Sequence, residues 1–276
     1  FDNNFILSGT VMINTSGFNG TLGGVISGSG NLIISDNLSL GLGTVGETPN
    51  TYSGGTTLAA GKTVTIYKSG ALGTGIVTMA DNTTLQFGAA ATIPNSITLN
   101  GTTATINTGG FASTLTGIIS QVGTTITKLI VKGGNILTMN AVTSHEGGTE
   151  VQGGTTLFAG ISNLFGGLNK SLSLMDAGST FDITSGSQVL GNLNGEAGTI
   201  VKLGNNTLTL GTENNSSFAG VIQDNGNIGK IIKQGTGTWS VSGLNTYSGG
   251  TAISAGTIQV GNSSALGTGT VSMENG

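Results

Sequence analysis

The chain has 276 residues, including 51 glycines, two prolines and no cysteine, and only 7% of its residues are charged. A compact globular enzyme has about 25% charged residues, far more than this chain has. A disordered chain is poor in apolar residues, whereas 36% of the residues here are apolar. The composition therefore fits neither class. The net charge is −4 and all eight basic residues are lysines, so no basic stripe is available for phosphates and nucleic acid is excluded as an expected partner. The lack of cysteine removes thiolate nucleophiles and thiolate metal sites.

Short runs that alternate apolar residues with Thr, Ser or Asn occur along the whole chain, for example at Thr63–Ile66, Thr105–Asn107 and Thr207–Leu210. This period of two predicts half-buried strands, and turn signals at intervals of roughly 8–12 residues predict that the strands are short. Ile161–Leu168 could form two helical turns, but its glycines argue against a helix. No apolar run approaches the ~20 residues that span a bilayer.

One cassette recurs three times in chain order. Gly24, Gly117 and Gly220 each open a Gly-Val/Ile-Ile string, and a ring-bearing residue that begins a ring-x-Gly-Gly-Thr turn follows after 27 or 28 residues. The predicted structural residues of these turns are Tyr52, Gly54, Gly55, Gly147, Gly148, Tyr247, Gly249 and Gly250. His145 stands at the tyrosine position of the middle turn, where its ring is expected to pack as a structural variant. Repetition at this spacing predicts modules at about 18–110, 111–217 and 218–276, the last one truncated.

The repeats and the glycines together predict an all-β fold, a parallel β-solenoid. A sandwich or barrel would need different edge and central strands, whereas stacked coils see the same neighbours and let the sequence drift. Glycine suits the corners of such coils because positive φ costs it least. At about 20–25 residues per coil, residues 1–276 would form one continuous β-helix fragment of about a dozen coils.

The string Ile231–Thr251, followed by Ala255–Val260, resembles the passenger-associated transport repeat, also called the autotransporter-associated β-strand repeat. The first copy keeps Asn50–Thr56 of the pattern. The middle copy keeps Lys132 and Gly-Gly-Thr but has His145 where the family has tyrosine. The framing elements of the repeat recur in all three modules, so the resemblance covers most of the chain.

This resemblance implies a passenger of a type V autotransporter from a Gram-negative bacterium. Such a passenger folds outside the outer membrane as a right-handed parallel β-helix, and is either secreted or held on the bacterial cell surface. Its implied partners are a host-cell surface protein or glycan, neighbouring bacteria, and its own C-terminal β-barrel translocator, which is not in this chain. Since the sequence begins at Phe1 without a signal peptide, we expect it to be a piece of a longer protein.

Three groups of residues are candidates for catalytic or metal-binding chemistry. His145 with Glu146 and Glu150 could suggest a metal or acid–base site, but a single imidazole does not make the ligand cluster that zinc requires. Asp176 and Asp182 could suggest glycan cleavage, which needs two carboxyl groups flanking one bond. A serine triad would have to use His145, and no G-x-S-x-G elbow is present. We therefore expect no catalytic residue, no cofactor and no metal.

Two further interpretations concern surfaces. The aromatic residues Trp239, Tyr52, Tyr67 and Tyr247 could stack on glycans, but those at the turns are expected to pack adjacent coils together. Threonine pairs such as Thr63/Thr65 and Thr207/Thr209 are typical of ice-binding solenoids, but here they lack a constant short period.

The sequence thus favours a non-enzymatic stalk or adhesin in cell or host attachment. The alternatives are a released toxin or signalling ligand for a host receptor and a glycan-active β-helix enzyme. Because the middle module diverges most and is the longest, possible binding loops are expected there. The candidate residues are His145, Glu146, Leu164, Phe165, Asn169 and Lys170.

Overall fold

The computed structural model describes residues 2–41 and 48–273. It divides the chain into two compact units: the first consists of Phe1–Leu137 and Thr143–Gly147, and the second of Thr138–Val142 and Gly148–Gly276. Throughout the described residues every regular element is a strand, and no helix long and apolar enough to cross a membrane occurs among them. The boundary between the units falls inside the second predicted module, so the division into modules within one continuous fragment stays a prediction.

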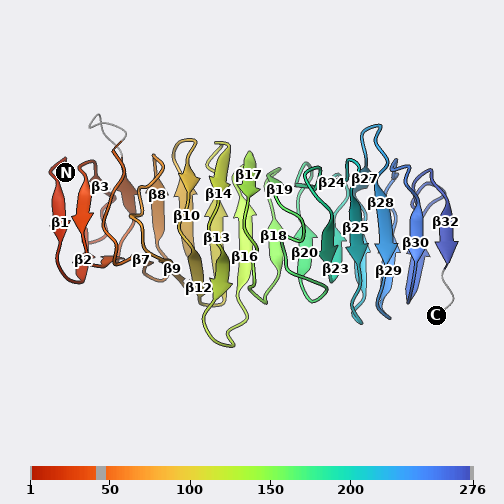
Figure 1. Cartoon of the computed structure of the whole chain (residues 1–276), viewed down its shortest axis with the longest axis horizontal. Helices are drawn as coiled ribbons and strands as arrows, with labels where there is room; N and C mark the ends of the chain where they lie inside the picture. Colours follow the sequence, from red (N-terminus) through yellow and green to blue (C-terminus); the bar gives the residue numbers. More distant parts are fainter. Residues whose placement is uncertain (1, 42–47, 274–276) are drawn as a thin grey trace. The chain divides into compact units, whose positions relative to one another are not determined.

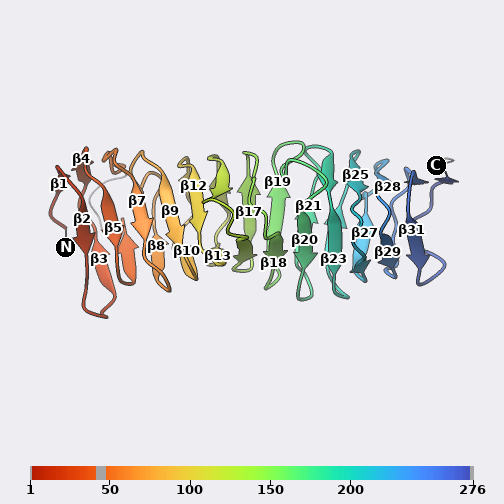
Figure 2. The same ribbon diagram turned by 90° about the horizontal axis from the view of Figure 1, so that it is seen from below.

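The first unit contains two long parallel sheets. Sheet I has the order β2 (Val11–Ile13), β5 (Leu32–Ile34), β7 (Thr56–Leu58), β9 (Val77–Ala80), β12 (Ile97–Asn100) and β15 (Ile119–Gln121). Sheet II has the order β3 (Gly20–Leu22), β6 (Leu38–Leu40), β8 (Thr63–Ile66), β10 (Thr83–Phe87), β13 (Thr103–Asn107) and β16 (Lys128–Lys132). Two short pairs complete the unit: β1 (Phe5–Leu7) with β4 (Ile26–Gly28), and β11 (Thr92–Ile93) with β14 (Ser113–Leu115). Figure 2 shows β7, β9 and β12 in succession.

The second unit contains three parallel sheets. Sheet III has the order β18 (Thr149–Val151), β20 (Ser171–Leu174), β23 (Asn192–Gly195), β26 (Ser216–Phe218), β29 (Thr238–Val241) and β31 (Thr257–Val260). Sheet IV has the order β19 (Thr156–Ala159), β21 (Thr180–Asp182), β24 (Ile200–Lys202) and β27 (Val221–Gln223). Sheet V has the order β22 (Gln188–Leu190), β25 (Thr207–Leu210), β28 (Lys230–Lys233), β30 (Thr251–Ile253) and β32 (Val271–Met273), and Figure 1 shows β25, β28 and β30 side by side. The remaining strand, β17 (Ile136–Met139), contains the sequence boundary of the two units.

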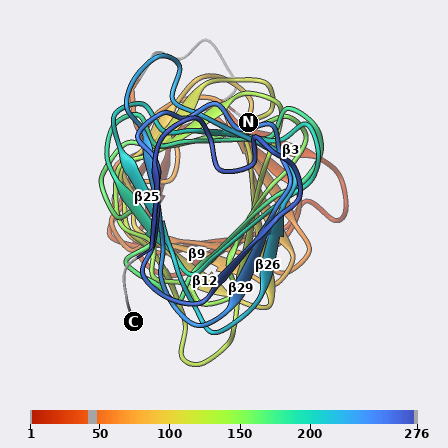
Figure 3. The same cartoon turned by 90° about the vertical axis from the view of Figure 1, so that its right-hand side faces the viewer.

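Each unit is a parallel β-solenoid, and together they have about 13 turns, which confirms the predicted fold class. Strands that follow one another in a sheet belong to successive coils, as the pairing of β9 with β12 and of β26 with β29 shows. In the end-on view of Figure 3 these paired strands lie near one another. The registers join residues one coil apart, for example Leu85 with Ile106 and Leu208 with Ile231. Since these inward partners are all buried, each sheet contributes aliphatic columns to the core.

The alternation of the strands places threonine, serine and amide side chains on the outer faces. On sheet I the register aligns Thr57, Thr78 and Thr98 in one outward row, although their spacing along the chain varies. On sheet II it aligns Ser39, Thr65 and Gln86. The rows come from pairing between coils, so the irregular spacing of threonines in the sequence hides them.

Candidate functional site: repeat corners and a polar hollow

The three predicted turns form buried corners, which we call the first corner (Asn50–Thr56), the middle corner (Thr143–Thr149) and the third corner (Asn245–Thr251). In the first, Tyr52 is fully buried and its hydroxyl lies 2.5 Å from Thr56 Oγ1, which donates to the Leu72 carbonyl at 3.1 Å. In the third, Tyr247 lies 2.6 Å from Thr251 Oγ1 in the same way. Burial raises the pKa of both tyrosines to about 12. These rings are therefore held as neutral interior groups.

The asparagine two residues before each tyrosine links neighbouring coils. Asn50 Oδ1 accepts the Ile26 N–H at 2.9 Å, and its Nδ2 donates to the Ala71 carbonyl at 2.7 Å. Asn245 repeats the acceptor bond with Ile222 at 2.7 Å and the donor bond with Ala265 at 2.6 Å. A buried amide that satisfies a donor on one side and an acceptor on the other is costly to replace. Sequence reasoning did not assign this role, although the recurrence of Asn50 and Asn245 was a signal.

The two glycines of each corner serve different purposes. A Cβ on Gly54, Gly147 or Gly249 would lie 2.6, 2.3 or 2.5 Å from backbone atoms of the preceding coil. The glycine that follows has a positive φ, +103° at Gly55 and +77° at Gly148. The first glycine therefore permits close packing of coils and the second permits the turn, which supports the predicted structural role.

The middle corner keeps this backbone with different side chains. Ser144 N–H donates to the Ile119 carbonyl at 2.8 Å, as Thr51 N–H does to Ile26. His145 is buried, and its Nδ1 lies 2.5 Å from Oγ1 of Thr143, which stands at the position of Asn50. Across residues 2–41 and 48–273, no group of three or more His, Cys, Asp or Glu side chains could hold a metal ion. His145 is thus placed as the packing equivalent of the tyrosines.

The residue after each corner ring donates its backbone N–H, and the acceptor differs among the three corners. Ser53 donates to the Gly28 carbonyl at 3.0 Å and Glu146 to Gln121 Oε1 at 2.8 Å. Ser248 donates to Asp224 Oδ2 at 2.7 Å from its N–H and at 2.8 Å from its hydroxyl. Burial alone would raise the pKa of Asp224, but the bonds from Ser248 and Gly229 hold it below the ordinary value. The third corner therefore depends on a carboxylate where the other two use neutral oxygens.

The lysine of the family pattern also has a structural role in the third copy. Lys233 is buried, and its Nζ donates to the Gln234 carbonyl at 2.6 Å and to the Gly235 carbonyl at 2.9 Å. Burial lowers the pKa of this lysine. Lys132 of the middle copy is instead exposed. The lysine of the third copy therefore stabilises a corner by binding its carbonyls.

The predicted binding loops are only partly at the surface. Leu164 and Phe165 are buried: Leu164 N–H donates to Gln188 Oε1 at 2.8 Å, and the Phe165 ring packs on Phe181 with centroids 5.8 Å apart. The expectation that Leu164, Phe165 and His145 contact a partner is therefore corrected, because their side chains fill the core. Glu146 and Asn169 are exposed and Lys170 is half-buried, so binding at these three stays a prediction.

The other predicted site groups also have structural roles. Asp176 Oδ2 accepts the Gly153 N–H at 2.9 Å, and Asp182 Oδ1 accepts the hydroxyl of Thr184 at 2.7 Å. Trp239 and the two corner tyrosines are buried and cannot form a glycan-stacking surface, whereas Tyr67 is half-buried. The aromatic hypothesis thus fails at three of its four residues.

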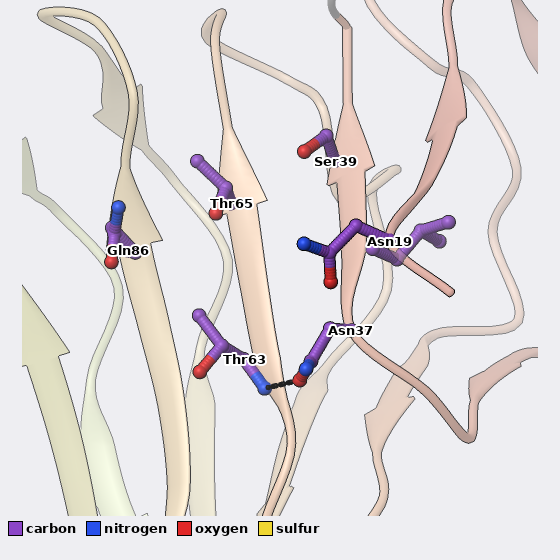
Figure 4. A pocket seen from close by; sticks show the side chains of 7 residues that line it. Asn19, Asn37, Ser39, Thr63, Thr65 and Gln86 are labelled. Atoms are coloured by element: carbon purple, nitrogen blue, oxygen red, sulfur yellow. Dashed lines mark hydrogen bonds between the residues drawn. The ribbon is translucent and has the colours of Figure 1, made fainter. Parts of the chain in front are cut away.

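A polar hollow lies on the outer face of sheet II (Figure 4). Its volume is about 260 Å³, and its lining residues come from successive coils: Asn19, Asn37, Leu38, Ser39, Thr63, Thr65 and Gln86. Asn37 Oδ1 accepts the Thr63 N–H at 2.8 Å, the bond drawn in Figure 4. All of these side chains are uncharged. The hollow therefore offers amide and hydroxyl groups on a rigid sheet.

Stacked parallel coils with recurring glycine corners define a repeat-built β-solenoid, and comparison with known proteins gives its family. Residues 129–157 and 231–260 match the passenger-associated-transport-repeat family. The chain is also 34% identical over 224 residues to the adhesin BmaC autotransporter of Brucella suis biovar 1 (strain 1330). The chain belongs to the autotransporter passengers that carry these repeats, as its sequence predicted.

That alignment covers 75% of this chain but only 6% of the Brucella protein. Because three quarters of the chain is covered, the similarity includes residues of both compact units. No solved structure matches the chain. Membership of this family implies a secreted, surface-exposed protein.

Proposed function

We propose that this chain is a non-enzymatic segment of an adhesin-like passenger, exposed on the outside of the outer membrane after export through its own C-terminal β-barrel. Its role is attachment to a host-cell surface protein or glycan, or to neighbouring bacteria. The observation that carries the proposal is the similarity over three quarters of the chain to a protein named as an adhesin.

The outer faces of the coils support this role. Sheet II presents Ser39, Thr65 and Gln86 in register, and sheet III presents Ser217, Ser240 and Gln259. Such rows of uncharged polar groups keep the surface hydrated and recur from coil to coil. Many weak contacts along a repeated surface act together once one of them has formed. A solenoid is therefore suited to attachment over an extended area.

The test is surface display of the full-length passenger with its barrel on a non-adherent bacterium. Antibody labelling of the passenger confirms that it reaches the surface. We expect attachment of the displaying cells to epithelial cells, or to one another, to exceed that of cells carrying the barrel alone. Verified display without any gain in attachment would refute the proposal, and activity of the purified soluble passenger on host cells would favour the ligand alternative.

A further inference from the structure

We propose that the polar hollow of sheet II, formed by Asn19, Asn37, Ser39, Thr63, Thr65 and Gln86, binds one unit of a neutral saccharide. This inference deepens the proposed function, on which its adhesive meaning rests. It is carried by the hollow itself, whose lining residues come from four successive coils (Figure 4).

The first argument is the unused hydrogen-bonding capacity of the lining groups. Thr63 Oγ1, Thr65 Oγ1 and the Asn19 amide form no hydrogen bond with any described residue. Two asparagine amides elsewhere in the coils are instead bound to the preceding coil. Asn135 donates to the Gly110 carbonyl at 2.8 Å, and Asn206 donates to the Ile183 carbonyl at 2.9 Å. The hollow is thus a place where such groups remain open to a ligand.

The second argument is the absence of charge among the lining residues. Amides and hydroxyl groups both donate and accept, which matches the hydroxyl groups of a sugar. An anionic ligand would lose hydration here without a cation to compensate it, because the lining residues are Asn, Gln, Ser, Thr and Leu. The nearby ammonium group of Lys62 is paired with Asp36 at 3.1 Å and is not among them. The chemistry therefore favours a neutral ligand.

The third argument is size and rigidity. A volume of about 260 Å³ lies just below the range of roughly 300–1,000 Å³ for pockets that hold drug-sized ligands. Most of the lining belongs to β6, β8 and β10, whose register fixes the spacing of the groups before binding. With no aromatic platform in the lining, we expect weak binding of one sugar unit at each chain.

The test measures saturation-transfer NMR between the purified chain and millimolar lactose, cellotetraose or maltotetraose, with 3′-sialyllactose as the acidic counterpart of lactose. We expect transfer from the protein to at least one neutral sugar, and less transfer to sialyllactose than to lactose. The double variant Thr63→Val/Thr65→Val removes two open hydroxyl groups while keeping β-branched side chains, and should weaken binding at least about fivefold. Its matched control, Thr207→Val/Thr209→Val, makes the same change at the two outward threonines of one strand, β25 of sheet V.

Circular dichroism confirms that both double variants fold, and Asn19→Ala, outside the strands, serves as a second test if Thr63→Val/Thr65→Val does not fold. No transfer to any neutral sugar, or an equal loss in the sheet V control, would overturn the inference. The display assay separates the two proposals. If the displayed passenger attaches and Thr63→Val/Thr65→Val attaches equally well, the proposed function stands and the saccharide inference falls. If display gives no attachment while lactose binding depends on Thr63 and Thr65, the function falls and the saccharide site stands.

Discussion

The third corner and the middle corner have the same backbone but different polar interiors. In the third, Asn245 links two neighbouring coils, and Tyr247 reaches forward to Thr251 at 2.6 Å. In the middle, the His145 ring bonds back to Thr143 at 2.5 Å. Both keep a Gly-Gly pair that brings coils close and turns the chain. The corner backbone thus requires its two glycines, whereas the ring and its polar partners can be exchanged together.

The largest expected effect is on the glycine shared by all corners. Gly54→Ala, Gly147→Ala and Gly249→Ala should each lower the free energy of unfolding by about 3 kcal/mol, because the new methyl group would overlap backbone of the preceding coil. Urea unfolding followed by circular dichroism measures the loss. Gly9→Ala is the control, since no atom lies within 4 Å of its added Cβ. If Gly147→Ala alone were tolerated, the middle corner would not share the glycine requirement of the other two corners.

The next effect separates tyrosine corners from the histidine corner by pH. The pKa of Tyr52 and Tyr247 is raised to about 12 by burial, so their contribution to stability is complete below pH 10 and is lost as the pH rises from 10 to 12. Tyr52→Phe/Tyr247→Phe should cost about 1 kcal/mol per site at pH 7 for the lost hydrogen bonds, and should flatten the alkaline loss. Stability measured from pH 7 to 12 checks this. An alkaline loss as steep as that of the parent chain would contradict the assignment, and Tyr67→Phe is the control.

A smaller effect on the free energy of unfolding tests whether His145 and its partner Thr143 are energetically coupled. His145→Tyr alone and Thr143→Asn alone should each destabilise the chain by about 1 kcal/mol, because each leaves one buried partner mismatched. The double variant Thr143→Asn/His145→Tyr should recover most of the loss, with a coupling energy of about 1 kcal/mol. A double-mutant cycle by urea unfolding measures it. Simple additivity of the two losses would show that the corner residues act independently.

The smallest effect concerns the acceptor after each ring. Because the pKa of Asp224 is held below its ordinary value, its stabilising contribution is present above the unfolded-state pKa of about 4 and is lost as the pH falls through the folded-state value. Asp224→Asn should therefore reduce the acid sensitivity of unfolding between pH 5 and pH 2. Gln121→Glu should introduce such sensitivity at the middle corner, where Gln121 Oε1 binds Glu146 N–H. Identical acid profiles for the parent chain and Asp224→Asn would contradict this.

Much of this architecture could be predicted from the sequence. Alternating runs such as Thr207–Leu210 predicted strands, and the repeated ring-x-Gly-Gly-Thr turns predicted corners, because period and turn chemistry are local properties. The substitution of His145 for tyrosine was interpreted as structural, and its burial supports that interpretation. Leu164 and Phe165 were expected in a binding loop, and their burial could not be predicted, because the bond from Leu164 to Gln188 and the contact of Phe165 with Phe181 join residues a coil apart.

The parallel β-solenoid, its glycine corners and the passenger family therefore follow from the amino-acid sequence. Which residues meet between coils is set by the three-dimensional pairing of the strands. Coil length varies, with 26 residues from Leu38 to its partner Val64 and 20 from Ile97 back to Val77. Thr57 and Thr78 thus fall into one row, and Thr65 and Gln86 into one hollow, without any fixed interval along the chain. The physical reason is that hydrogen bonding between coils sets the register, whereas the corner loops absorb the differences in length.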